Sequence, residues 1–162
     1  MDKGGKEMNV EYINPFVEAS QAVLQQVAGI EAKLGNIFLK SSPYASDSVA
    51  IIVGLTGKIR GQVIFTMSKK VAMSIASGMM GGMLVTELDE ISKSAISELA
   101  NMILGNTATL FYNRGKYIEI TPPSFLMGDN MQISSNKIET VCVPLLLDND
   151  GVIELDISIE GR

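Results

Sequence analysis

Residues 89–112 read DEISKSAISELANMILGNTATLFY, and this stretch carries the clearest structural signal in the chain. Asp89 is a typical N-cap residue, and no proline interrupts the residues that follow it. Apolar side chains recur along one broad helical arc: Ala95, Ile96, Leu99, Ala100, Met102, Ile103, Leu104, Leu110 and Phe111. The stretch therefore predicts an amphipathic helix from Glu90 to about Tyr112 that buries this arc against a core.

The opposite arc of the same helix holds Ser94, Ser97, Glu98, Asn101 and Gly105. An ordinary solvated face would explain Glu98 and Asn101 as a surface charge and a neutral surface amide. However, Asn is a poor residue for a helix interior, and Gly costs about 1 kcal/mol there relative to Ala. The small neighbours Ser94, Ser97 and Gly105 would also let another macromolecule approach closely. The composition of this face therefore favours a contact surface.

Upstream, the sequence predicts a first long helix followed by strands. Asn14 as N-cap and Pro15 at the first helical position mark its start, and Gly35-Asn36 marks its end. Its apolar positions at helical spacing are Phe16, Val23, Val27, Ile30 and Leu34. Strands are expected at 36–40, 48–55 and 59–67, with a hairpin turn at 56–58, and then a short helix from its N-cap Ser68 to Gly78.

Downstream, the pattern returns to strands. A strand is expected at 117–121, then a break at Pro122-Pro123, a polar loop around 128–130, and a hairpin of 138–147 and 152–159. This order predicts an α+β fold around a largely antiparallel sheet. Because no long linker divides the chain, we expect one domain at 9–162, preceded by a tail at 1–8 that is disordered or was added in cloning.

The composition excludes several classes of function. The 162 residues include 13 Lys plus Arg against 18 Asp plus Glu, a formal charge of -5 that argues against nucleic-acid binding. The absence of histidine removes Ser-His-Asp and Cys-His catalysis. Cys142 lies in an apolar run and is expected to be a buried thiol rather than a reactive thiolate. Without a His/Cys cluster or a spaced carboxylate set, no metal site is expected.

The chain shows no signal for a membrane span or for export. Its mean hydropathy is +0.24, but the longest uncharged stretch, 71–86, has only 16 residues and contains glycines. The N-terminal MDKGGKE has charges of both signs and no apolar segment. We therefore expect a cytoplasmic protein.

The polar face and its surroundings resemble the CheC, CheX and FliY phosphatases of bacterial chemotaxis, and CheX-type members most closely. Ser94, Glu98 and Asn101 match the family motif Ser/Asp-x-x-x-Glu-x-x-Asn. Further matching landmarks follow in the family's order: Ile13-Asn14-Pro15-Phe16, Gly61-Gln-Val-Ile-Phe65, Met79-Met-Gly-Gly and Ile120-Thr-Pro-Pro. The resemblance covers residues 9 to 160.

This resemblance implies a CheC-like fold with an internal pseudo-duplication, and an enzyme that hydrolyses the aspartyl phosphate of a CheY-like response regulator. It implies that Asn101 orients the attacking water and that Glu98 pairs with the active-site lysine of the regulator. No cofactor of its own is implied, because the regulator would supply Mg²⁺. The resemblance also implies a homodimer.

Some relatives carry a second motif on the first helix, and here Asn14-x-x-x-Glu18-x-x-Gln21 has the same spacing. The longer Gln side chain would misplace the carboxamide, so we expect an inactive copy. Two alternatives to an enzyme stay open. The chain could be a non-catalytic docking module, like the flagellar switch protein FliM, whose related fold lacks the motif. It could also be a scaffold that binds a phosphorylated regulator without hydrolysing it.

Overall fold

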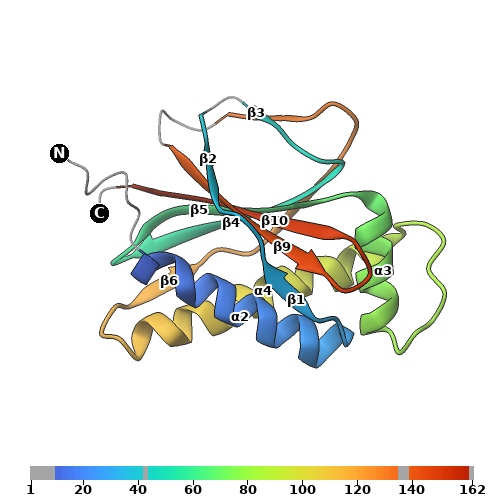
Figure 1. Ribbon diagram of the computed structural model, residues 1–162, viewed down its shortest axis with the longest axis horizontal. Coiled ribbons are helices and arrows are strands. Elements are labelled where there is room, and N and C mark those ends of the chain that lie inside the picture. The colour runs from blue at the N-terminus through green and yellow to red at the C-terminus, as the bar shows by residue number, and fades with distance from the viewer. Residues whose placement is uncertain (1–9, 42–43, 135–138, 161–162) are drawn as a thin grey trace.

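The computed structural model describes residues 10–41, 44–134 and 139–160 of the chain (Figure 1). Along the chain, helices alternate with groups of strands. Within these residues the elements are α2 (Val10–Ala28), β1 (Ala32–Leu34), β2 (Phe38–Lys40), β3 (Tyr44–Ala45), β4 (Val49–Gly57), β5 (Arg60–Met67), α3 (Lys69–Met79), α4 (Glu90–Tyr112), β6 (Ile118–Ile120), β7 (Ser124–Met127), β8 (Gln132–Ile133), β9 (Thr140–Leu147) and β10 (Val152–Glu160).

The strands build an eight-stranded sheet in the order β1-β9-β10-β5-β4-β6, with β2 also paired to β9 and β7 to β4. Every strand pair described is antiparallel, including the separate small pair β3–β8. Figure 1 shows α2 and α4 side by side against one face of the sheet, with β3 beyond the opposite face. The predicted α+β class and antiparallel sheet are confirmed.

The two halves of the chain repeat one plan. A long helix is followed by five strands, as α2 with β1 to β5 and as α4 with β6 to β10, and α3 stands between the halves. The pairing follows the same plan, because β1 and β2 pair with β9 while β6 and β7 pair with β4. The halves meet at the central pair β5–β10. The expected internal pseudo-duplication is therefore present in the order and pairing of the elements.

The main core lies between the sheet and the two long helices. Alternate residues of the central strands, such as Val53, Val63 and Leu155, face this core together with Phe16 on α2 and Ile103 on α4. A second, smaller apolar cluster on the opposite face contains Ala50, Ile64 and Ile133. The period of two along each strand thus supplies both faces with buried side chains.

The predictions for the second and third helices are confirmed. α4 runs from Glu90 to Tyr112, and the Asp89 carboxylate accepts a hydrogen bond from the Ser92 backbone N–H at 2.9 Å. This hydrogen bond holds the pKa of Asp89 below its usual value. The Ser68 hydroxyl caps α3 in the same way, at 3.1 Å from the Val71 nitrogen.

The predicted limits of the first helix are wrong at both ends. α2 begins at Val10, so Asn14 is not its N-cap and Pro15 lies inside it. The longer helix packs Ile13 into the core, which offsets the hydrogen bond that Pro15 cannot donate. α2 ends at Ala28, because Gly29 adopts a left-handed φ of +66° and Ile30 turns back to bond the Leu24 carbonyl at 3.1 Å.

The strand predictions are confirmed in their main parts, with local differences. The hairpin turn expected at 56–58 lies one to two residues later, since β4 continues to Gly57. The short strands β1, β3, β7 and β8 were not predicted, because two to four residues carry too little periodicity to detect, and the residues of β1 were assigned to the first helix. The tail at 1–8 and the first residue expected for the final hairpin, Ile138, lie outside the described residues.

Candidate functional site

The polar face predicted on α4 points away from the core. Ser94 and Glu98 are exposed, while Ser97, Asn101 and Gly105 are partly buried. On the opposite side of the helix, the predicted apolar arc is buried at Ile96, Leu99, Ala100, Ile103, Leu104 and Phe111. The division of α4 into a core arc and a polar face is therefore confirmed.

An open groove of about 850 Å³ lies beside this face, between α4 and the connection from β6 to β7. The groove is lined on the helix side by Glu90, Lys93, Ser94, Ser97, Glu98 and Asn101, and on the other side by Ile120, Thr121, Pro122, Pro123 and Phe125. The structure thus brings Ser94, Ser97, Glu98 and Asn101 together at one concave surface. Gly105 lies one turn beyond Asn101 and is outside the lining.

The far wall of the groove is fixed to the sheet. The Thr121 backbone N–H donates to the Gly54 carbonyl at 3.0 Å, and the Gly54 N–H donates to the Thr121 hydroxyl at 2.8 Å. A Cβ on Gly54 would lie only 3.1 Å from the Thr121 methyl group, so the close approach suits glycine. The sequence predicts a strand at 117–121 and a break at Pro122-Pro123, but it does not predict that residues 120–123 form this wall. The paired prolines, which favour a rigid connection, were the available signal.

The functional groups of Glu98 and Asn101 are available to a partner. No hydrogen bond within the described part of the chain engages the Glu98 carboxylate or the Asn101 carboxamide. The two residues are three apart on α4 and therefore share one face. A carboxamide can donate and accept hydrogen bonds at once, which suits it to holding a water molecule, whereas a carboxylate suits a cationic partner. Lys93 lies on the same wall, with its Nζ 3.7 Å from Glu90 Oε2.

The polar groups of this face show no activated nucleophile within the described residues. Ser94 and Ser97 offer hydroxyl groups, but a serine nucleophile needs a general base within hydrogen-bond reach, and neither hydroxyl is hydrogen-bonded to the nearby Lys93, Glu90 or Glu98. What the face can supply is orientation of a reactant and recognition of charge. Such a site is suited to a substrate that brings its own activated group.

Comparison with known proteins assigns the family. The family model described as "Chemotaxis phosphatase CheX" matches residues 49–146, which include α4 and the groove wall. The chain belongs to the CheX family. It is 31% identical over 154 residues to the CheY-P phosphatase CheX of Thermotoga maritima. The matched region covers 95% of this chain and 99% of that protein.

Solved CheX structures share this fold. The chemotaxis protein CheX of Desulfovibrio desulfuricans superposes with a TM-score of 0.84 at 28% identity, over 93% of this chain and 99% of that one. CheX in the CheX-CheY-BeF3-Mg²⁺ complex of Borrelia burgdorferi gives a TM-score of 0.80 at 31% identity, over 94% of this chain and 100% of that one. The family resemblance and the predicted CheC-like fold are confirmed.

In this CheX-family chain the second copy of the motif lies on α2 at equivalent positions. Asn14 and Ser94 are each the fifth residue of their helices, and Gln21 corresponds to Asn101 in the same way. Gln21 differs from Asn101 because its Nε2 donates to the Ala32 carbonyl at 3.0 Å. The carboxamide of Gln21 therefore holds α2 to the start of β1, which supports the prediction of an inactive copy.

The described helices contain no segment that is long and apolar enough to cross a membrane.

Proposed function

We propose that this chain hydrolyses the aspartyl phosphate of a CheY-like response regulator, with α4 laid across the regulator's phosphorylation site. The observation that carries the proposal is the pair Glu98 and Asn101. In this chain of the CheX family, these two polar groups make no hydrogen bond within the described residues and lie at the edge of an open groove. The curated relative from Thermotoga maritima, named CheY-P phosphatase, supports the same activity.

Asn101 acts by positioning. Its carboxamide holds a water molecule in line with the bond between phosphorus and the aspartyl oxygen, and the attack releases inorganic phosphate and a free aspartate carboxylate. An acyl phosphate is already activated, so orientation of the water supplies most of what the reaction needs. Three backbone positions away, Glu98 pairs with the regulator's active-site lysine. That ion pair fixes the register of α4 on the regulator.

Magnesium enters with the regulator. The relative from Borrelia burgdorferi was crystallised in a complex with CheY, BeF3 and Mg²⁺. On the face proposed for docking, Glu90 already lies near Lys93. We assign Glu98 to the regulator's lysine and not to a metal ion. We therefore expect Mg²⁺ to be a requirement of the regulator's phosphorylated site, in the cytoplasm where such regulators act.

We also propose that the chain forms a homodimer. Several apolar side chains are exposed on the edge of the sheet formed by β1, β2, β9 and β10: Leu34, Phe38, Leu39, Leu146 and Val152. Exposed apolar clusters are typical of protein contacts. Light scattering during gel filtration should give twice the chain mass of 17.4 kDa, and a monomer at micromolar concentration would contradict the dimer.

The role of Asn101 is tested by Asn101→Ala. Alanine is the better helix former, so the variant should fold and should not be less stable than the wild type. We expect the rate of phosphoregulator decay in the complex to fall by on the order of 10²-fold, as for the loss of a positioning group. The measurement is decay of the phosphorylated regulator at saturating protein, with regulator affinity measured separately. A variant that binds and hydrolyses as the wild type does would contradict this role.

A further inference from the structure

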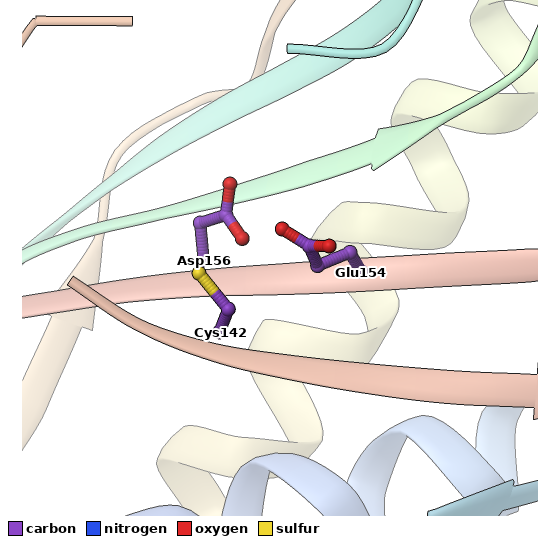
Figure 2. Close-up of side chains that lie close together, drawn as sticks. All are labelled: Cys142, Glu154 and Asp156. Carbon is purple, nitrogen blue, oxygen red and sulfur yellow. The ribbon is translucent and has the colours of Figure 1, made fainter. Parts of the chain in front are cut away.

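A second polar cluster lies on the far side of the sheet from α2 and α4. Cys142 on β9 pairs with Asp156 on β10, and Glu154 stands two residues earlier on the same face of β10. One ligand atom from each of these three side chains lies within 4.8 Å of the others. Figure 2 shows the Glu154 and Asp156 carboxylates turned toward each other, with the Cys142 sulfur beside Asp156. None of these residues takes part in the site on α4.

Asp156 is the anomaly in this cluster. It is only 1% exposed, and neither carboxylate oxygen has a hydrogen-bond partner within the described part of the chain. A buried carboxylate without a partner is costly, because it has lost its hydration and gained nothing in return. The fold therefore leaves a place for a counter-charge next to Asp156.

The fold itself does not require a carboxylate there. Asp156 on β10 pairs with Ile64 on β5 in the central pair of strands. Within its own hairpin, Asp156 also pairs with Cys142 on β9. In the same way, Ile64 also pairs with Ile52 on β4. The pair Cys142–Asp156 thus occupies in one half the place that Ile52–Ile64 occupies in the other. The other half packs this face with an apolar cluster. Polar side chains at the equivalent place indicate a use that packing does not explain.

Within the described residues, one cationic side chain contacts the cluster, that of Lys40. Lys40 on β2 places its Nζ 2.8 Å from Glu154 Oε2, and the two side chains are 25% and 19% exposed. This pair forms the accessible edge of the cluster. If a metal ion displaced their protons, the Cys142 thiolate and the two carboxylates would carry three negative charges, of which Lys40 compensates one. One divalent cation would make the cluster neutral.

We propose that Cys142, Glu154 and Asp156 bind one Zn²⁺ ion. A thiolate ligand selects zinc over magnesium and calcium, which prefer oxygen alone, and carboxylate oxygens are accepted zinc ligands. Three protein ligands leave the fourth position to water. The ion would add a link between the paired strands β9 and β10. No metal site is expected from the sequence, because these ligands come from two strands and have no motif spacing.

The test uses the full chain, stripped of metal with a chelator and dialysed. Calorimetric titration with ZnCl₂ should show one Zn²⁺ per chain, and saturating Zn²⁺ should raise the Tm. Titration with Co²⁺ should give a thiolate-to-cobalt charge-transfer band, which in a chain with one cysteine can arise only from Cys142. Zinc that binds no more tightly than to exposed carboxylates, or cobalt without this band, would overturn the proposal.

Two ligand variants and one control complete the test. Cys142→Ser and Asp156→Asn should each weaken Zn²⁺ binding by at least on the order of 10-fold and abolish the rise in Tm. Asp156→Asn should fold well without metal, because it removes the buried carboxylate. Glu87→Gln, which removes an exposed carboxylate between α3 and α4, should leave the affinity unchanged. Wild-type zinc affinity in a folded Asp156→Asn variant would exclude this site.

Discussion

Glu98 is an exposed charge for which we propose a docking function. It lies one turn from Asn101, at the edge of a groove that has small or rigid residues around it. We predict that Glu98→Lys weakens binding of the regulator by on the order of 10²-fold, because it would place like charges together. Glu98→Gln should weaken binding less, since it removes the attraction without adding repulsion. Calorimetric titration with the BeF3-activated regulator measures both.

The control for this charge change is built into the chain. Glu18 occupies the equivalent place on α2 and is exposed like Glu98. Glu18→Lys makes the same change in net charge, but it should leave regulator affinity and the hydrolysis rate at wild-type values. If Glu18→Lys and Glu98→Lys weaken binding equally, the affinity would depend on the net charge of the chain, and the docking assigned to α4 would be wrong.

The residues on the outer face of the sheet show where sequence reasoning stops. The apolar neighbours of Cys142 correctly predict that the thiol is buried. The alternation Glu154-Leu-Asp156-Ile-Ser158 suggests a solvated polar face, yet Asp156 and Ser158 are buried. Segments distant in the sequence lie on this face: Lys40 on β2 contacts Glu154, and Tyr44 on β3 packs against the apolar cluster of Ala50 and Ile64. Local periodicity identifies the two faces of a strand but not what packs against each of them.

For single helices, the prediction of their limits from the sequence succeeded where the local signals were strong. α4 has a cap, an uninterrupted apolar arc and a contrasting polar face, and its start at Glu90 and its end near Tyr112 were predicted correctly. α2 has competing signals, because Asn14-Pro15 is typical of a helix start and Ile30 and Leu34 continue the helical spacing. Tertiary packing decided both ends, and Gly29 rather than Gly35 supplied the left-handed residue. The groove wall at 120–125 could not be placed beside α4 without the fold.

Gly105 tests how far along α4 the docking face extends. A Cβ at this position would meet no atom within 4 Å, so Gly105→Ala should raise stability by about 0.5–1 kcal/mol. Gly105→Leu should also fold, but the larger side chain should weaken regulator affinity by about tenfold, or about 1.4 kcal/mol. Thermal melts and titrations of the two variants separate these effects. Unchanged affinity in Gly105→Leu would place the edge of the interface before this residue.

In the proposed mechanism the reaction is divided between two proteins. This chain would supply Asn101 and Glu98, while the regulator would supply the phosphoryl group, Mg²⁺ and the lysine. We therefore predict no detectable hydrolysis of p-nitrophenyl phosphate or of phosphoserine peptides, because neither brings the rest of the active site. Release of p-nitrophenol or phosphate, followed with the wild type and with Asn101→Ala, checks this. Turnover of a small substrate that depends on Asn101 would contradict the division.

The central claim is that the chain is a catalyst and not a passive binding partner. The most direct test is a time course of a phosphorylated CheY-like regulator in Mg²⁺, with this protein at about a tenth of its concentration so that each copy must act repeatedly. We predict that the whole regulator pool loses its phosphate much faster than it does alone, and that Asn101→Ala abolishes the acceleration. Decay no faster than the regulator's own would contradict the account and leave a docking module or a scaffold as the explanation.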